Sequence, residues 1–187
     1  DSVASRGLGD VYKRQDIMKT LVVVGHPDLA SSVVNKAWVE ALRPYEGEQL
    51  KIHNLGDVIR EDGTFDLKSE QRLLEQYDRI VLQFPLYWYM PPAILKLWMD
   101  TVWAEGWAWG DCPHALEGKL IEAATSCGAP EVAFSQTPLS TYLSFVQGSA
   151  GFVKARGGDY FAFYGAEGEG SAERLKTNCK EYIKFCL

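Results

Sequence analysis

The sequence predicts an α/β fold in which one parallel sheet of five strands has helices on both faces. Short apolar, β-branched runs alternate along the chain with segments of helical period, the pattern of repeated strand–helix–strand units. The 187 residues, 47% of them hydrophobic, suit one domain with a sizeable core. Because crossovers between parallel strands are right-handed, the expected strand order in so short a chain is 2-1-3-4-5.

Five segments are predicted as strands: Thr20 to Val24, Gln49 to Leu55, Arg79 to Phe84, Lys119 to Ala124 and Tyr160 to Tyr164. Runs such as TLVVV and RIVLQF carry few polar residues. That composition is typical of a parallel strand buried on both faces.

Helices are predicted between these strands. The first extends from about Ser31 to Arg43, where Val34, Ala37, Trp38, Ala41 and Leu42 form one apolar stripe and Pro44 ends the helix. Gly56 to Asp66 is predicted as a polar loop. Ser69 is the predicted cap of the next helix, which carries Leu73, Leu74 and Tyr77. Further helices are predicted after Pro91 and Pro92, near Pro138 to Val146, and from about Ser171 to Phe185.

Residues 1–17 show no apolar period and no signal-peptide core, whereas Met18 precedes a clear strand. We expect these residues to be a non-native or disordered N-terminal extension. Residues 18–187 are expected to form the single folded domain.

Composition excludes several function classes. The formal net charge is −6 and no cluster of Lys and Arg occurs, which argues against general nucleic-acid binding. It leaves room for an anionic cofactor, because a helix N-terminus binds phosphate without net positive charge. The three histidines are scattered, so no zinc site is predicted, and no apolar run is long enough for membrane insertion.

The four cysteines, Cys112, Cys127, Cys179 and Cys186, show no C-x-x-C spacing. A disulfide framework is therefore not expected. This pattern favours a reducing compartment, and we expect a cytoplasmic location.

The predicted strand order places a switch point between the first and third strands, where ligands bind beyond the carboxyl ends. Three loops should meet there: Gly25 to Ser32, Pro85 to Pro92, and Thr125 to Pro130. In the first loop, Ser31 and Ser32 could hold a phosphate at the helix N-terminus, with Asn35 one turn further. The plain alternative is that Ser31 is only an N-cap.

The second loop is the most informative of the three. Leu86, Tyr87, Trp88 and Tyr89 follow a buried strand directly. Exposed aromatic groups need a partner to cover them, and a planar heteroaromatic ring is one such partner. The alternative is that they pack on a neighbouring helix or subunit.

The third loop reads TSCGAP and offers N–H and hydroxyl donors from Thr125, Ser126, Cys127 and Gly128, although a plain βα turn would look the same. Cys127 is interpreted as a small buried residue rather than a nucleophile, because no histidine is placed to activate it. Five of the six tryptophans fall between Trp88 and Trp109, which indicates either a thick local core or a homodimer interface.

Three segments of the sequence resemble a known family. FPLYWYMPPAILKLWMDTVWAEGWAWG, GHPDLASSVVNKAW and ALEGK resemble signatures of the NAD(P)H:quinone oxidoreductase family, the DT-diaphorase-like branch of the flavodoxin-like fold. The short length is similar to that of bacterial members.

The resemblance implies a flavin-dependent oxidoreductase that takes hydride from NADPH or NADH and passes electrons to a quinone or similar small acceptor. FMN is the expected flavin, with FAD as the alternative. The residues implied to hold it are His26, Ser31, Ser32, Val33 and Val34 in the first loop, Pro85, Leu86, Tyr87, Trp88 and Tyr89 in the second, and Thr125, Ser126, Cys127 and Gly128 in the third.

Two departures from the family pattern matter. The third loop often reads T-T-G-G in the family, and Ala129 to Gln136 lacks the tyrosine and histidine that handle protons in well-studied members. Tyr142 is a possible stand-in. Two other functions remain open: a flavin-binding regulatory subunit of a potassium efflux system, with a membrane transporter as partner, and a non-enzymatic electron carrier of the flavodoxin type.

Overall fold

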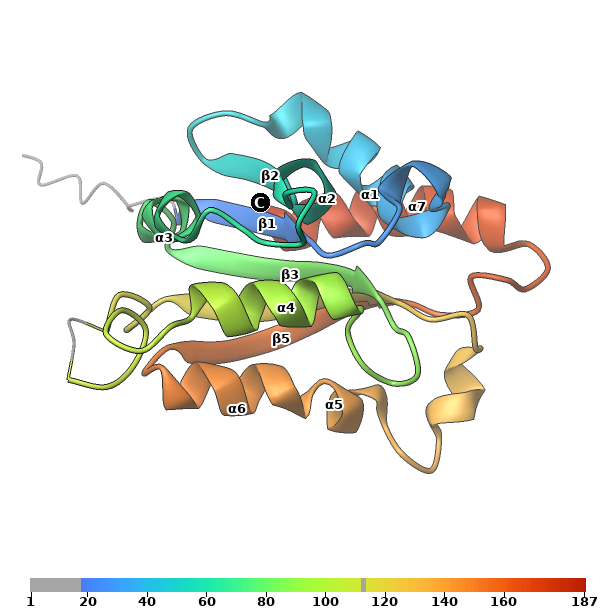
Figure 1. Cartoon of the computed structure of the whole chain (residues 1–187). Coiled ribbons are helices and arrows are strands. Elements are labelled where there is room, and N and C mark those ends of the chain that lie inside the picture. Colours follow the sequence, from blue (N-terminus) through green and yellow to red (C-terminus); the bar gives the residue numbers. More distant parts are fainter. Residues whose placement is uncertain (1–17, 112–113) are drawn as a thin grey trace, which may run out of the picture.

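A computed structural model describes residues 18–111 and 114–187, so the expectation for residues 1–17 lies outside the described residues. Five parallel strands form one sheet in the order β2-β1-β3-β4-β5, as the sequence predicts (Figure 1). The strands are β1 (Thr20–Val24), β2 (Leu50–Asn54), β3 (Arg79–Pro85), β4 (Leu120–Ser126) and β5 (Arg156–Phe163).

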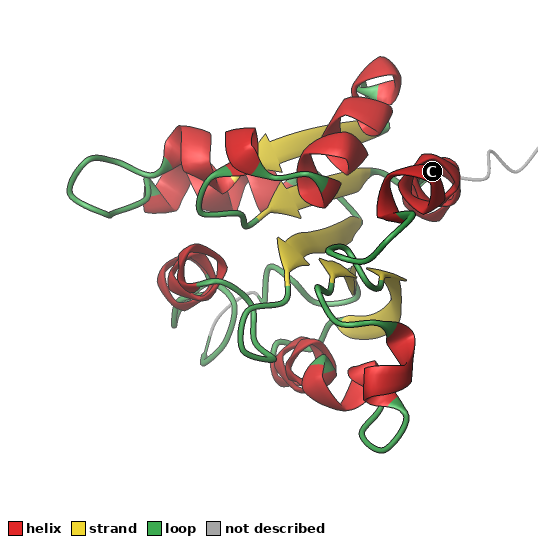
Figure 2. Ribbon diagram, turned by 90° about the vertical axis from the view of Figure 1, so that its right-hand side faces the viewer, coloured by secondary structure: helices red, strands yellow, loops and turns green. Residues whose placement is uncertain are grey.

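Helices cover both faces of the sheet, which gives three layers (Figure 2). α1 and α7 pack on one face, while α3, α4 and α6 pack on the other. The helices are α1 (Val34–Leu42), α2 (Leu55–Val58), α3 (Leu67–Glu75), α4 (Ala93–Val102), α5 (Leu139–Tyr142), α6 (Ser144–Phe152) and α7 (Ser171–Cys186), and 3-10 turns span Leu29–Ser31, Arg43–Tyr45 and Glu131–Phe134.

The apolar content of the strands explains this layering. Every residue of β1 is buried, and alternate side chains enter the two cores. Between the sheet and α7, Trp38 stacks on Tyr182 with ring centroids 4.7 Å apart. Burial of the apolar side chains in these two cores, away from water, is the main force that holds the layers together.

Three strands are longer than the sequence indicates, and β3 is longer only by Pro85. β4 continues to Ser126, so Thr125 and Ser126 belong to the strand, and the third loop begins at Cys127. β5 begins at Arg156 instead of Tyr160. The start of the strand was missed because Gly157 and Gly158 are residues typical of loops. Gly158 is required for space, since a Cβ there would lie 2.5 Å from Glu122 Oε1.

Several helices begin at residues other than those predicted. The first segment divides into a 3-10 turn and α1, so the helix does not begin at Ser31. Asp66 rather than Ser69 caps α3, since its carboxylate accepts from the Ser69 N–H at 3.0 Å. The predicted loop after β2 starts as the short helix α2, capped by Asn54, because capping there outweighs the low propensity of Gly56.

The single helix predicted near Pro138 to Val146 is two helices, α5 and α6, which meet at Leu143. α6 extends to Phe152 although it contains Gly148 and Gly151. Buried contacts of Val146 and Ala150 with the core stabilise it despite the low helix propensity of glycine.

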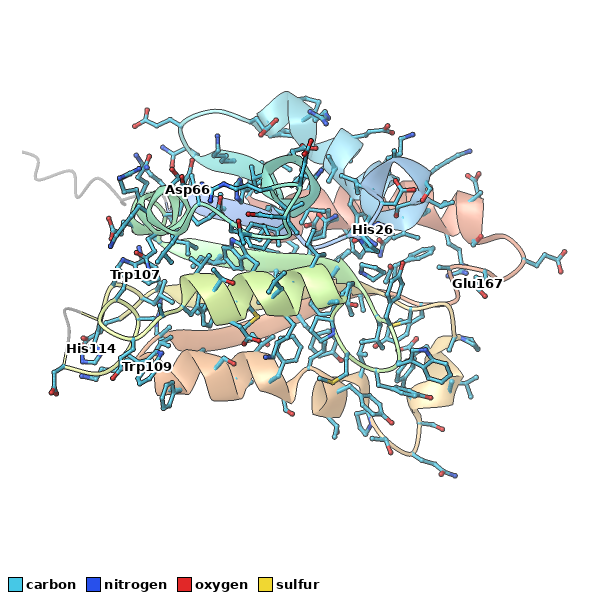
Figure 3. The ribbon with its side chains drawn as sticks, viewed as in Figure 1. His26, Asp66, Trp107, Trp109, His114 and Glu167 are labelled. Carbon is cyan, nitrogen blue, oxygen red and sulfur yellow. The ribbon has the colours of Figure 1, made fainter. Side chains whose placement is uncertain are left out.

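The tryptophan-rich segment lies mostly within the molecule. Trp98 and Trp103 are buried, and Trp107 and Trp109 are partly buried. Figure 3 shows Trp107 and Trp109 at the opposite end of the molecule from His26 and Glu167. A thick local core therefore accounts for four of the five, and among these tryptophans only Trp88 is exposed.

A buried polar group ties the edge of the sheet to two helices. Glu70 of α3 lies 2.7 Å from His53 Nε2 on β2, and it accepts a hydrogen bond from Trp98 Nε1 of α4 at 2.8 Å. Within residues 18–111 and 114–187, no helix combines the length and the apolar character that crossing a membrane requires.

Candidate functional site

The carboxyl ends of β1, β3, β4 and β5 meet, and this brings the three predicted loops together. The Gly25 N–H donates to Gln83 O, and the Leu86 N–H donates to Ser126 O, each at 2.8 Å. The Cys127 N–H donates to Phe163 O at 2.8 Å. The loops thus share one backbone framework at a single edge of the sheet.

In the first loop, His26 is buried and its tautomer is fixed by its neighbour. The Asp28 N–H donates to His26 Nδ1 at 3.0 Å, so Nδ1 carries a lone pair. Burial lowers the pKa of His26, despite the opposing charge of Asp28 and the hydrogen bond from its backbone. The ring is therefore neutral near pH 7, and its proton is on Nε2, which makes Nε2–H a donor.

The serines of this loop have different roles. Ser31 bonds back to Asp28 through both its N–H and its hydroxyl and does not cap α1. The Ser32 hydroxyl accepts from the Asn35 N–H at 3.1 Å and does cap it. The N–H groups of Val33 and Val34 have no acceptor in the described part of the chain, which leaves two donors at the start of α1. Val33 is exposed and Val34 is buried.

The second loop is a tight turn between Tyr87 and Met90. The Met90 N–H donates to Tyr87 O at 3.0 Å, and the Tyr87 N–H donates to Met90 O at 2.9 Å. Trp88 and Tyr89 have φ of +50° and +63°, which is the signature of a type I′ turn. Such turns usually contain Asn or Gly, because a Cβ in this region costs roughly 1–2 kcal/mol per residue.

The turn presents its central residues outward. Trp88 is 93% exposed, and neither its N–H nor that of Tyr89 meets an acceptor among the described residues. Below them, Pro85 is buried and Leu86 is partly buried. Tyr87 meets the edge of His26, with ring centroids 6.4 Å apart, which joins the first and second loops.

Tyr142 also lies at this turn. Its ring packs on Tyr89 with centroids 4.6 Å apart. Tyr142 is the last residue of α5, which follows the third loop in the sequence. Sequence reasoning named Tyr142 with nothing to fix its position, and the structure brings it to the second loop.

In the third loop, the four predicted residues are not equivalent. Thr125 is fully buried on the α4 and α6 side of the sheet, and its hydroxyl has no partner in the described chain. Ser126 faces α1 and accepts from Asn35 Nδ2 at 3.0 Å. Burial raises the pKa of the Cys127 thiol to about 12, which agrees with an inert buried residue.

Gly128 is exposed, and the Glu167 carboxylate lies over it, 3.3 Å from where a Cβ would be. Glu167 belongs to the loop between β5 and α7, a fourth loop that sequence reasoning did not include. Gln83 was also missed. A glutamine inside the otherwise apolar run IVLQF was a signal that could have found it, whereas nothing in the sequence singles out Glu167.

Taken together, several donors without an acceptor in the described chain lie at this edge. They are the N–H groups of Val33, Val34, Trp88 and Tyr89 and the imidazole Nε2–H of His26. A ligand that matches them needs acceptors: an anion at the start of α1 and a ring with carbonyl oxygens or unprotonated nitrogens at the turn. The ribityl phosphate and the isoalloxazine ring of a flavin fit this donor set.

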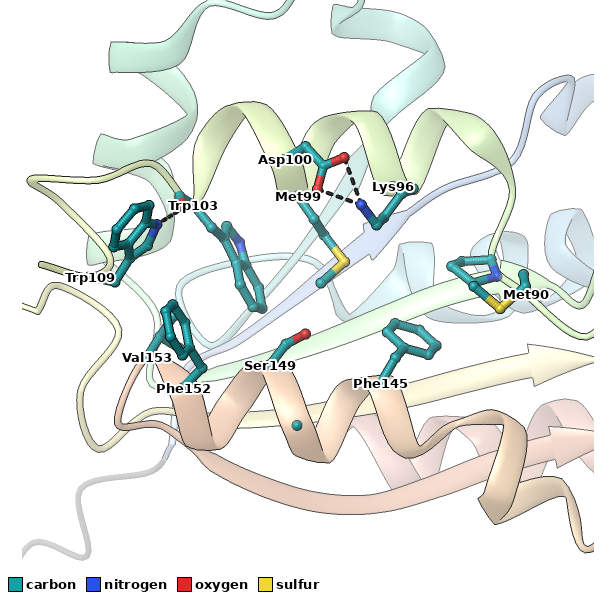
Figure 4. A pocket seen from close by; sticks show the side chains of 12 residues that line it. Met90, Lys96, Met99, Asp100, Trp103, Trp109, Phe145, Ser149, Phe152 and Val153 are labelled. Carbon is teal, nitrogen blue, oxygen red and sulfur yellow. Dashed lines mark hydrogen bonds and ion pairs between the residues drawn. The ribbon is translucent and has the colours of Figure 1, made fainter.

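A groove of about 530 Å³ begins beside the turn and follows the gap between α4 and α6 (Figure 4). Apolar side chains line most of it, including Met90, Met99, Trp103, Phe145 and Phe152. The Lys96–Asp100 ion pair lies along its α4 rim.

Comparison with known proteins identifies the family of this chain. Residues 18–185 match the flavodoxin-like fold family. A Bacillus subtilis protein named uncharacterized NAD(P)H oxidoreductase YrkL is 38% identical over 171 residues, which cover 84% of this chain and 95% of YrkL.

Two solved structures are similar. General stress protein 14 of Treponema denticola, solved in complex with FMN, has a TM-score of 0.83 and 31% identity, covering 90% of this chain and 97% of its own. An NADPH-quinone reductase from P. pentosaceus has a TM-score of 0.78 and 32% identity, covering 91% and 98%. The resemblance drawn from the sequence is confirmed, and the chain belongs to the family of flavodoxin-like fold proteins.

Proposed function

We propose that this protein is a flavin-dependent NAD(P)H oxidoreductase that holds FMN at the carboxyl edge of its sheet. The observation that carries the proposal is the set of unpaired donors on the type I′ turn and at the start of α1. The names of the similar proteins, an NAD(P)H oxidoreductase and a protein solved with FMN, support the same activity and cofactor.

Each loop has a distinct part in this proposal. The N–H groups of Val33 and Val34, with the dipole of α1, hold the phosphate. The N–H groups of Trp88 and Tyr89 bind the edge of the ring, and His26 Nε2–H donates between the two loops. Ser126 contacts the bound group from the third loop, whereas Cys127 only packs, because its thiol stays protonated.

The bound flavin supplies the redox chemistry, accepting hydride from NADPH or NADH and passing electrons to an acceptor. The protein positions the ring at an exposed turn, so that nucleotide and acceptor can reach it in succession. We propose a quinone as acceptor, supported by the name of the P. pentosaceus protein. Tyr142, which packs on Tyr89, is the proposed proton-handling residue.

We also propose that two copies associate through the turn and the groove between α4 and α6. Trp88 and Met90 of the turn and Phe152 of the groove are exposed apolar side chains. Cys127, Cys179 and Cys186 are free, which supports a reducing compartment such as the cytoplasm.

An absorption spectrum of the purified protein, recorded before and after anaerobic addition of NADPH or NADH, tests the function. We expect flavin bands that bleach directly to the two-electron-reduced form and recover when a quinone is added. Mass spectrometry of the released cofactor distinguishes FMN from FAD.

Two results would contradict this proposal. Bound flavin that neither nucleotide reduces would favour the electron-carrier or efflux-regulator alternatives. A protein that binds no flavin after reconstitution would remove the basis of all three.

A further inference from the structure

A continuous chain of hydrogen bonds crosses the core from α7 to the end of β4. The Tyr182 hydroxyl donates to Gln83 Oε1 at 2.8 Å. Gln83 Nε2 donates to the backbone oxygen of Asn35 at 3.1 Å and to Asn35 Oδ1 at 3.3 Å. Asn35 Nδ2 then contacts Ser126 Oγ at 3.0 Å. All four residues are buried.

The direction of this chain is fixed by one backbone atom. A carbonyl oxygen can only accept, so the group that Gln83 presents to Asn35 O must be its NH₂. The same NH₂ meets the Asn35 side chain, which must therefore turn its oxygen toward Gln83 and its own NH₂ toward Ser126. The amide orientations are thereby determined by chemistry.

Ser126 is left with one possible role. Its hydroxyl oxygen accepts from Asn35, so its proton must be donated to another group. Among the described residues this hydroxyl donates no hydrogen bond, and Ser126 is only 7% exposed. The Ser126 hydroxyl can therefore donate to a ligand, and such a ligand would gain one hydrogen bond here.

We propose that Asn35 and Gln83 are positioning residues that fix the Ser126 hydroxyl as a donor to an oxygen of the ribityl phosphate arm of bound flavin. This inference rests on the proposed function. The arm is favoured over the ring because Ser126 faces Asn35 in the first turn of α1, the end of the crevice where the phosphate is proposed to bind. This hydrogen-bond chain favours a ligand atom that accepts a hydrogen bond from Ser126 and disfavours a ligand atom that donates one.

Ser126→Ala removes the proton, and Ser126→Thr retains it. We expect Ser126→Ala to weaken FMN binding about tenfold, as for one hydrogen bond to a charged or strongly polar acceptor, and Ser126→Thr to restore most of the affinity. Fluorescence titration of the apo-protein with FMN measures this. A parallel titration with riboflavin distinguishes a phosphate oxygen, where the loss disappears, from a ribityl oxygen, where it persists.

Asn35→Asp tests the positioning role, because it places an oxygen where the NH₂ faced Ser126. The serine proton then turns to residue 35 and is withdrawn from the ligand. We expect FMN affinity to fall in the native background and to fall much less in Ser126→Ala, since a double-mutant cycle removes the direct effect of the new charge. Tyr182→Phe is the matched control: it lowers thermal stability but leaves FMN affinity within about twofold, because Asn35 O still orients Gln83.

Unchanged FMN affinity in Ser126→Ala, in a wild-type protein that binds FMN, would overturn this inference alone. An equal effect of Asn35→Asp in both backgrounds would also overturn it, because Asn35 would then act independently of Ser126. A wild-type protein that binds no FMN would overturn the proposed function itself, which separates the two failures.

Discussion

Trp88 and Tyr89 keep a left-handed backbone conformation that bulky side chains rarely adopt. Trp88 is almost fully exposed, so its side chain stabilises the free protein little. Conformational strain in a functional loop persists when something else requires that geometry, and here the turn aims two N–H groups outward.

Two substitutions at Trp88 separate strain from binding. We expect Trp88→Gly to be about 1 kcal/mol more stable than Trp88→Ala, because only alanine retains a Cβ at positive φ. Denaturant unfolding of the two apo-proteins measures the difference. Equal stabilities would mean that the turn relaxes in solution.

The same Trp88→Ala variant should retain less flavin than the wild type after purification, because an aromatic contact with the ring is lost. The ratio of flavin absorbance to protein absorbance checks this. Full flavin content would argue against placing the ring at this turn.

Cys127 is expected to resist alkylation at pH 8, because burial raises its pKa to about 12 and keeps the thiolate scarce. Mass spectrometry of the peptide that contains Cys127, after iodoacetamide treatment of the native protein, measures the reaction. Complete labelling within minutes would show that the thiol is accessible and ionised. Unfolded protein provides the positive control.

At the scale of elements, two glycines inside regular secondary structure are expected to affect stability in opposite directions when replaced by alanine. Gly158 of β5 lies against buried Glu122, which is held in an ion pair by Arg79, whereas nothing lies within 4 Å of a Cβ on Gly148 of α6. We expect Gly158→Ala to lower the free energy of unfolding by about 1–3 kcal/mol through overpacking. Gly148→Ala should raise it by about 0.5–1 kcal/mol. Thermal or urea unfolding compares them, and a tolerated Gly158→Ala would show that Glu122 can move.

The Glu70 group that joins β2, α3 and α4 predicts acid sensitivity. Burial alone would raise the Glu70 pKa, but hydrogen bonds from His53 and Trp98 and the charge of His53 together lower it below 4.5. A carboxyl with a depressed folded-state pKa contributes stability that is present above its unfolded pKa and is lost as pH falls through the folded value.

We therefore expect Glu70→Gln to flatten the loss of stability below about pH 4.5. Urea unfolding of both proteins between pH 7 and pH 3 measures this. Parallel acid slopes would show that other carboxyls dominate.

At the scale of the whole molecule, the proposed self-association is testable at Phe152, which is 68% exposed and lines the groove between α4 and α6. Phe152→Glu should shift the protein from dimer to monomer in sedimentation velocity, because a charge on this apolar face cannot be desolvated cheaply. Glu173→Lys on exposed α7 is the control for surface charge. A monomeric wild type would end the proposal.

The strands were predictable because segments such as β1 and β3 are short runs dominated by apolar residues. The strand order followed from the handedness of the crossovers between parallel strands. The site loops were predictable from strand order. The ends of the elements were not predictable. The start of β5 was missed because Gly157 and Gly158 are typical of loops. The residue that caps α3 is Asp66, which only the hydrogen bond to the Ser69 N–H identifies. Side-chain directions at the site, such as Thr125 into one core and Ser126 toward α1, required the full register of β4.

The position of β1 between β2 and β3 has a consequence for synthesis. Asp78, at the start of β3, binds the backbone N–H of Lys19 across 59 residues of sequence. A ribosome adds about 5–20 residues per second, so the apolar β1 segment waits several seconds before its inner partner emerges. Until then β1 can pair only with β2, so one edge of an apolar strand stays open, and we expect folding yield in the cell to depend on chaperones that cover it.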